Sequence, residues 1–321
     1  MPEDLFPAAE TTTAPLDPAA DYSHGAAWMQ GRIVPMSEAR LPVNDWGVTR
    51  SDAVYDVAPV WDGAFVGLDR YLDRFMASLD WVRMEIPVDR EGVREILHRI
   101  VAASGLRESY VAMVCTRGLP LIPGTRDPRT CRQNFYCWCV PYIWVIPQEV
   151  AERGARLFVP TGEEAVRRIP EQSLNPRAKN YHWADFTQAL MQGLDEGYDT
   201  AAVLDMEGNV SEGPGFNLFA VTGDRLVTPA RGVLEGRTRG VVMELAESLG
   251  LQVEARALPL EEFLEADEVF LSTTGGGPAP IVDVNGRVFG NGAPGTRTLA
   301  LKEAYRRWLT EGPEREPVNY G

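Results

Sequence analysis

Lysine and histidine are scarce in this chain of 321 residues. Only two of its 31 basic residues are lysines, Lys179 and Lys302, and it has three histidines, His24, His98 and His182. A three-histidine zinc site would need all of these widely separated residues, and a Ser-His-Asp triad would rest on His98 or His182 without any supporting motif. We therefore expect neither a metal centre nor a hydrolase triad.

The chain also has no excess of positive charge and no long apolar segment. Its formal charge of −15 argues against binding to nucleic acid or anionic membranes, because both need clustered positive charge. No uninterrupted apolar run approaches the length of a membrane helix. Residues 1–20 are acidic and rich in Pro, Ala and Thr, without the basic start and apolar stretch of a signal peptide. These features predict a cytoplasmic protein whose partner is a small molecule.

The cysteines give no sign of a metal site or a disulfide framework. The four of them, at positions 115, 131, 137 and 139, lack the paired C-x-x-C spacing of a zinc site, and nothing indicates a secretory compartment. We expect them to be reduced thiols in the core.

The length and the hydrophobic pattern predict an α/β protein of two domains. Apolar residues at helical spacing predict helices over 68–84, 89–104, 183–196, 238–249 and 296–309. Strands are expected over 31–35, 43–60, 65–66, 110–116, 135–146 and 268–272, with a turn at 61–63, a long loop at 118–128, and a hairpin of 201–210 with 215–227. The predicted division is a mobile N-terminal arm (1–21), a small α/β domain (22–146), a linker (147–155) and a larger domain (156–321), with a cleft between the two domains.

Lys179 is the first candidate for chemistry. It lies in the segment Asn175-Pro-Arg-Ala-Lys-Asn-Tyr-His-Trp183, just before a predicted helix. A lysine amine suits Schiff-base chemistry when burial or a nearby cation lowers its pKa, although a lone lysine is more often a solvated surface charge. Lys302 fits the second description, because it falls in the amphipathic terminal helix beside Arg306 and Arg307.

Three further segments suit a planar, anionic ligand. Glu212 precedes glycines that allow the backbone to approach such a ligand, and its carboxylate is suited to keeping a pyridine nitrogen protonated. Arg237 and Thr238 open a predicted helix, where backbone N–H groups suit a phosphate. The segment 271–278, Leu-Ser-Thr-Thr-Gly-Gly-Gly-Pro, ends a strand in hydroxyls and glycines and lacks the pattern of a P-loop. Each segment alone is also compatible with a surface turn or an ordinary threonine helix cap.

In their order and spacing, these segments resemble the fold type IV PLP-dependent enzymes over roughly residues 22 to 321. That group contains branched-chain aminotransferases, D-amino acid aminotransferases, (R)-selective amine transaminases and aminodeoxychorismate lyases. Residues 50–57, 60–63, 179–185, 232–239 and 317–321 are most similar to the (R)-selective amine transaminases and their bacterial relatives. The resemblance implies a homodimer, each chain having a small N-terminal α/β domain and a larger, mixed, β-barrel-like C-terminal domain.

The resemblance also implies a role for each matching residue. Lys179 would hold pyridoxal 5'-phosphate (PLP) as a Schiff base and move a proton, while Glu212 would pair with the pyridinium nitrogen. The remaining cofactor contacts, chiefly to the phosphate, would come from Arg74, Arg237, Thr238, Thr274 and Gly275. The residues assigned to the substrate pocket are Arg50, Tyr55, Val57, Arg126 and Trp183.

Two positions depart from the pattern of the family. Tyr71 replaces a histidine that is common in the helix of Arg74, and Pro123 stands where a carboxylate-binding arginine is frequent, which leaves Arg50 and Arg126 as candidates for that task. We predict transamination from an (R)-amine or a D-amino acid, or from a branched-chain amino acid, to a keto acid such as pyruvate or 2-oxoglutarate. The alternatives are a PLP-dependent lyase of the same fold, which needs no keto acid acceptor, and a catalytically silent acidic binding protein.

Overall fold

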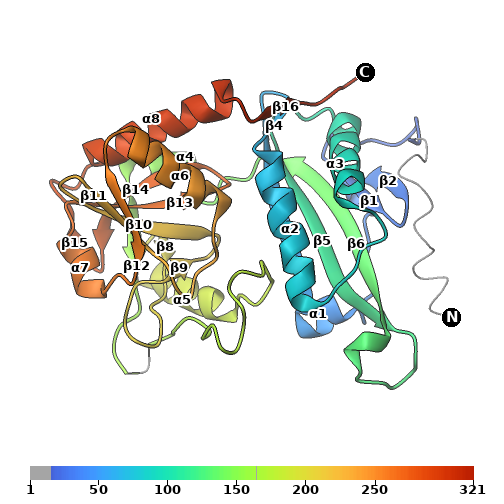
Figure 1. Cartoon of the computed structure of the whole chain (residues 1–321), viewed down its shortest axis with the longest axis horizontal. Helices are drawn as coiled ribbons and strands as arrows, with labels where there is room; N and C mark the ends of the chain where they lie inside the picture. The colour runs from blue at the N-terminus through green and yellow to red at the C-terminus, as the bar shows by residue number, and fades with distance from the viewer. Residues whose placement is uncertain (1–15, 164) are drawn as a thin grey trace. The chain divides into compact units, whose positions relative to one another are not determined.

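The computed structural model describes residues 16–163 and 165–321, and Figure 1 labels their helices and strands. Among these residues, backbone contacts define two compact units: unit 1 contains 16–143, 178–181 and 312–321, and unit 2 contains the rest. The domain boundaries expected from the sequence stay a prediction, and the arm expected over 1–21 lies outside the described residues up to residue 15. Two short returns to unit 1 therefore interrupt the order that the sequence suggested.

The described residues of unit 1 form a seven-stranded sheet in which every pair of neighbouring strands is antiparallel. Its strands, in spatial order, are β16 (Arg315–Pro317), β4 (Ala64–Val66), β3 (Ala53–Trp61), β5 (Ser109–Pro120), β6 (Cys131–Pro141), β1 (Ala26–Met29) and β2 (Arg32–Pro35). The predicted hairpin between β3 and β4 is present, and its turn uses Asp62 and Gly63 at φ values of 48° and 70°.

Helices α2 (Leu68–Val82) and α3 (Arg90–Ser104) pack on the sheet of unit 1 (Figure 1) and closely follow the predicted ranges. Their apolar stripes are buried, as the helical spacing predicted. Because side chains alternate along a strand, β3 contributes to two clusters. Val54, Ala58 and Val60 pack in the core beneath the helices, whereas Tyr55 and Val57 belong to a separate apolar cluster with residues of β5.

The strand predicted over 43–60 is wrong in its first half. Residues Trp46–Arg50 form the short helix α1, because the Asp45 carboxylate accepts a hydrogen bond of 2.7 Å from the backbone N–H of Gly47. This helix ends at Ser51, whose φ of 55° is left-handed. The loop predicted over 118–128 is also shorter than expected, since β5 continues to Pro120, and the 3-10 helix η3 (Pro128–Thr130) then leads into β6.

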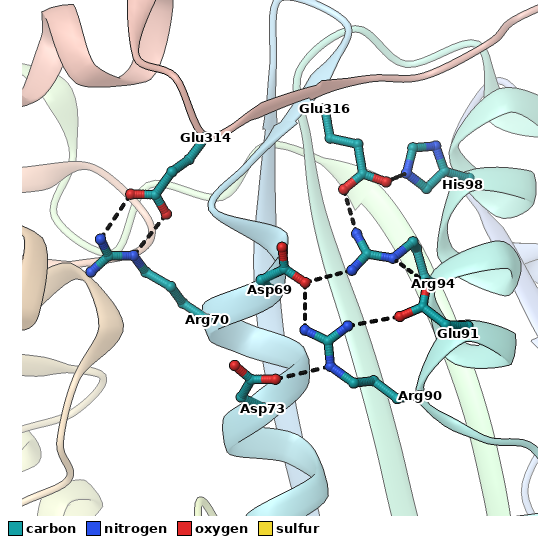
Figure 2. Close-up of polar contacts among 9 residues, drawn as sticks. All are labelled: Asp69, Arg70, Asp73, Arg90, Glu91, Arg94, His98, Glu314 and Glu316. Atoms are coloured by element: carbon teal, nitrogen blue, oxygen red, sulfur yellow. Dashed lines mark hydrogen bonds and ion pairs between the residues drawn. The ribbon is translucent and has the colours of Figure 1, made fainter.

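Charged side chains bind the C-terminal segment 312–321 to unit 1, as Figure 2 shows. Arg70 of α2 donates two hydrogen bonds, 2.7 and 2.8 Å long, to the Glu314 carboxylate. Arg94 of α3 donates to Glu316, whose other oxygen lies 2.8 Å from Nε2 of His98. Together with the pairing of β16 to β4, these contacts explain why the chain end belongs to this unit.

Unit 2 contains, within the part of the chain that the structure describes, a nine-stranded mixed sheet. Its strands are β7 (Ala155–Phe158), β8 (Thr200–Ala201), β9 (Glu212–Gly213), β10 (Phe216–Thr222), β11 (Arg225–Pro229), β12 (Gln252–Arg256), β13 (Glu268–Thr273), β14 (Gly277–Val284) and β15 (Arg287–Val288). Its helices are α4 (Gln148–Arg153), α5 (Ala184–Asp195), α6 (Arg237–Ser248), α7 (Leu260–Glu265) and α8 (Thr296–Glu311).

The hairpin predicted from 201–210 and 215–227 is wrong. β8 is only two residues long and pairs in parallel with β7, while antiparallel pairs in this region join β9 to β10 and β10 to β11. The short turn at Gly223, with a φ of 63°, connects β10 to β11. None of the helices in the described ranges combines the length and the apolar character that crossing a membrane requires.

Candidate active site

Lys179 is attached to strand β3 of unit 1 by its own backbone. Its carbonyl accepts a hydrogen bond of 3.0 Å from the N–H of Tyr55, and Asn180 forms an isolated antiparallel bridge with Val54. Its N–H donates to Oγ of Ser78, 3.2 Å away, on helix α2. The lysine therefore lies between β3 and α2, and its position is fixed at both sides by the main chain.

The amino group of Lys179 lies over an aromatic side chain. Nζ is 4.5 Å from the centroid of the Tyr55 ring, a cation–π distance. Tyr181 stacks on the same ring with a centroid separation of 4.1 Å and an angle of 3° between the planes. Val57, the next residue of β3 on this face, packs with Val114 of β5. The predicted pocket residues Tyr55 and Val57 thus form an apolar face beside the lysine.

Lys302 differs from the expectation of a solvated surface lysine. It is half-buried, and its Nζ donates a hydrogen bond of 3.1 Å to the carbonyl oxygen of Ala151. Both α8 and α4 pack against β14, which brings the two residues together. The amine of Lys302 is thereby engaged within unit 2, whereas that of Lys179 is in unit 1.

Arg74 of α2 is buried and forms an ion pair with Asp56 of β3. Nε and Nη2 of the arginine donate hydrogen bonds of 2.7 Å to the two carboxylate oxygens. The exposed fractions of the two side chains are 6% and 0%. Arg74 is therefore not a solvated helix charge, and its guanidinium is oriented by its partner.

The three loop and helix-end positions considered for carboxylate binding are exposed. Arg50 stacks on Trp46 of α1, with its guanidinium carbon 3.3 Å from the ring centroid. Arg126 and Pro123 lie in the exposed loop that follows β5. The pocket roles of Arg50 and Arg126 stay predictions.

Glu212 of unit 2 is buried among hydrogen-bond donors. Oε2 accepts from the backbone N–H of Leu234 at 3.0 Å and from Nδ2 of Asn217 at 3.4 Å, and Oε1 lies 3.3 Å from Nη2 of Arg168. The pairing of β9 with β10 places Glu212 opposite Asn217. A surface glutamate in a hairpin turn, the alternative from the sequence, is wrong because this side chain is only 7% exposed.

The start of α6 has no side-chain cap. Its N-cap is Gly236 and not a threonine, so the threonine cap considered from the sequence is wrong. Thr238, in that first turn, has its Oγ1 3.3 Å from Oγ1 of Thr274. Gly275, the next residue, uses its carbonyl to accept from Val145. Two hydroxyls therefore meet at a helix N-terminus, an arrangement that suits a phosphate.

The structure thus gathers the predicted site residues in two groups, one in each unit. Unit 1 contains Arg50, Tyr55, Val57, Arg74, Arg126 and Lys179, and unit 2 contains Trp183, Glu212, Arg237, Thr238, Thr274 and Gly275. Trp183 precedes α5 and packs edge-on against Phe186. Asp56, Arg168 and Asp185 were not among the predicted residues, although an aspartate inside the apolar run of β3 was a signal for the first.

The comparison with known families decides what these groups belong to. The profile described as amino-transferase class IV matches residues 53–284, which is more than half of the chain. This chain belongs to the class IV aminotransferases. The match includes Lys179, Glu212, Thr238 and Thr274 and begins at the first residue of β3.

Individual class IV aminotransferases are similar over nearly the whole chain. A putative branched-chain-amino-acid aminotransferase of Methanocaldococcus jannaschii is 31% identical over 282 residues, which are 87% of this chain and 94% of that protein. A D-alanine aminotransferase of Bacillus licheniformis is 25% identical over 278 residues, 85% of this chain and 93% of that protein. A branched-chain amino acid aminotransferase of T.th., solved with N-(5'-phosphopyridoxyl)-L-glutamate, has a TM-score of 0.84 at 27% identity, covering 92% of this chain and 99% of that one.

These findings confirm the predicted fold type IV architecture, the aminotransferase class and PLP as the cofactor. They support the resemblance at the level of the whole class, with branched-chain aminotransferases and D-alanine aminotransferases both among the relatives. The narrower similarity to (R)-selective amine transaminases concerns which amino donor the enzyme accepts.

Proposed function

We propose that this class IV aminotransferase moves the amino group of an amino acid with a branched apolar side chain to 2-oxoglutarate. The observation that carries the proposal is the position of the Lys179 amine over Tyr55, beside the apolar cluster that contains Val57 and Val114. A substrate bound at this amine would place its side chain against an apolar and aromatic surface, where branched aliphatic groups gain from burial. The T.th. enzyme is solved with an L-glutamate conjugate of the cofactor, which supports 2-oxoglutarate as the acceptor.

The side chains present fit PLP. Lys179 would hold the cofactor through its amine, and its Nζ would accept the proton lost by the substrate. Glu212 would pair with the ring nitrogen, while Thr238, Thr274 and the start of α6 would bind the phosphate. When bound, PLP supplies the electron sink that makes loss of this proton feasible. Arg74, which Asp56 orients, would be a further phosphate contact.

D-amino acids and (R)-amines are the second candidate donor class. The similarity to D-alanine aminotransferase over 85% of the chain supports them. Every amino acid donor has an α-carboxylate, so the exposed positions of Arg50, Arg126 and Pro123 do not separate the two donor classes. The similarity to the Methanocaldococcus jannaschii and T.th. branched-chain aminotransferases, together with the apolar face beside Lys179, supports branched-chain amino acids as the first choice.

A donor panel tests the proposal. Initial rates would be measured with L-leucine, L-valine, D-alanine and the two enantiomers of 1-phenylethylamine, with 2-oxoglutarate as acceptor and glutamate formation as readout. We expect L-leucine to give the highest kcat/KM. Faster turnover of D-alanine or of the (R)-amine would replace the proposal by the second candidate. Pyruvate release from aminodeoxychorismate without a keto acid would indicate the lyase, and failure to bind PLP would indicate the silent binding protein.

A pair of variants tests the apolar surface itself. Val57→Thr keeps the volume and adds a hydroxyl on the face of β3 beside Lys179, so kcat/KM for L-leucine should fall about tenfold, as expected for a polar group placed against an apolar side chain. Val60→Thr makes the same change on the opposite face, in the core beneath the helices, and serves as the matched control for stability. Equal losses in both variants would show that folding, not contact with the substrate, accounts for the effect.

A further inference from the structure

Three buried charged side chains of unit 2 form a continuous series of ion pairs. Nη1 of Arg168 lies 2.7 Å from Oδ2 of Asp185, and Nη2 of the same guanidinium lies 3.3 Å from Oε1 of Glu212. The exposed fractions of the three side chains are 8%, 5% and 7%. One positive charge is therefore shared between two carboxylates in a buried place, where charges interact more strongly than in water.

Backbone N–H groups hold the Asp185 end of the series. Oδ2 of Asp185 also accepts from the N–H of Ile169 at 3.1 Å, and Oδ1 accepts from the N–H of Phe186 at 2.8 Å. The Arg168 guanidinium stacks on the Phe186 ring, 4.5 Å from its centroid. Arg168 is thus bound more closely to Asp185 than to Glu212, and both partners hold its position.

We propose that Arg168 and Asp185 are positioning residues that set the net charge presented to the cofactor ring by Glu212. This inference rests on the proposed role of Glu212 toward the ring nitrogen. Arg168 holds Oε1 in place and offsets part of the negative charge of Glu212. The negative charge of Asp185 in turn offsets part of the positive charge of Arg168. The three residues together have a net charge of −1, and each substitution changes that value in a defined direction.

Other charged groups surround the series and stay unchanged in the test. Arg239 of α6 interacts electrostatically with Glu212. The cavity that Arg168 lines also has charged residues at its wall, namely Glu171, Asp205, Glu207 and Arg231. Arg231 and Glu171 are paired with each other at 2.7 Å, so they add little net charge.

The two positioning residues should shift a titration in opposite directions. Loss of the Arg168 charge makes the region more negative, which favours protonation of the bound cofactor. Loss of the Asp185 charge leaves more of the positive charge of the Arg168 guanidinium uncompensated, which disfavours protonation of the bound cofactor. At separations of this order in a partly polarisable interior, each shift should be on the order of one pH unit.

The experiment measures the pH midpoint of the visible absorbance change of the PLP-loaded protein, without substrate. Arg168→Met should raise the midpoint, Asp185→Asn should lower it, and Arg168→Met/Asp185→Asn should lie near the original value. Arg168→Lys, which retains the charge, should restore most of the midpoint. Shifts of the two single variants in the same direction, or no shift in either, would overturn the proposal.

Two control measurements show whether a shift of the midpoint reflects the changed charge or another effect of the substitution. Thermal unfolding of the PLP-free protein should show Arg168→Met as the least stable variant, because it leaves two buried carboxylates without their cation, and the double variant should recover stability. If Arg168→Met does not fold, Asp185→Asn and the double variant still give the sign of the effect. Glu212→Gln should also shift the midpoint, because it removes the carboxylate that would pair with the ring nitrogen. An unchanged midpoint in that variant would refute the proposed role of Glu212, whereas a shift there with none in the Arg168 and Asp185 variants would refute only this inference.

Discussion

The guanidinium of Arg74 is held by the carboxylate of Asp56 through two hydrogen bonds of 2.7 Å. Both side chains are buried, so each is the counter-charge that the other needs. The pair joins α2 to β3, the strand to which Lys179 is also bonded. The phosphate contact proposed for Arg74 would therefore depend on Asp56 as well.

Substitutions in the pair of Arg74 and Asp56 should change stability and cofactor binding independently. Arg74→Met leaves the Asp56 carboxylate buried without its cation, so the free energy of unfolding should fall by about 3–5 kcal/mol. Arg74→Met/Asp56→Val removes both charges and should recover most of that loss, while its affinity for PLP stays low. Urea unfolding and cofactor titration measure the two effects. A double variant that binds PLP as tightly as the original protein would contradict the role of Arg74.

The uncapped start of α6 leads to a second prediction. A Cβ at Gly236 would lie 2.1 Å from Oδ1 of Asn217, whose amide donates to Leu234 and Glu212. Gly236→Ala should therefore displace Asn217 and lower the affinity for PLP at least tenfold. Gly240→Ala, later in the same helix, meets no atom within 4 Å and should leave PLP binding unchanged while adding up to about 1 kcal/mol of stability. Similar effects of the two substitutions on cofactor binding would argue against the phosphate site.

Substitution of Arg50 tests directly whether this residue binds the carboxylate of the keto acid. If it binds the keto acid, Arg50→Ala should raise the KM for 2-oxoglutarate strongly and leave the half-reaction with a carboxylate-free amine nearly unchanged. Arg126→Ala is the matched variant, because both arginines are exposed. Stopped-flow measurement of each half-reaction gives the comparison. Equal losses in the two half-reactions would make Arg50 structural, in keeping with its contact to Trp46.

The thiols should be unreactive in the folded protein. All four cysteines are free and buried, and burial raises the pKa of Cys115 and of Cys137. Since the thiolate is the reactive form, alkylation near neutral pH should be slow until the chain unfolds, when four thiols become available. A thiol count by a chromogenic disulfide reagent, with and without denaturant, checks this. Rapid reaction of one thiol in the native state would contradict it.

Local sequence signals predicted much of the fold. The helices α2 and α3 follow from the 3.6-residue spacing of their apolar residues, and α3 also has its Asp89 cap, whose carboxylate accepts from Gly92 at 2.8 Å. The failure at α1 is also local in origin. There, a single cap at Asp45 turns five residues with strand-like composition into a helix.

Contacts between distant parts of the chain could not be predicted from the sequence. Nothing near Lys179 indicates that segment 178–181 bonds to β3, more than 100 residues earlier. The partners of Glu212 are similar, because Arg168 and Leu234 approach it from separate loops. Motif order therefore predicted the candidate site residues, whereas the groups that contact them became visible only in the fold.

The central claim is that Lys179 is the residue that binds PLP, and reductive trapping tests it most directly. The PLP-loaded protein would be reduced with borohydride, digested and mapped by mass spectrometry. The chain has only two lysines, so the result is unambiguous. We predict a pyridoxyl group on Lys179 alone, and no trapped cofactor in Lys179→Ala. A pyridoxyl group on Lys302, or on neither lysine, would contradict the account.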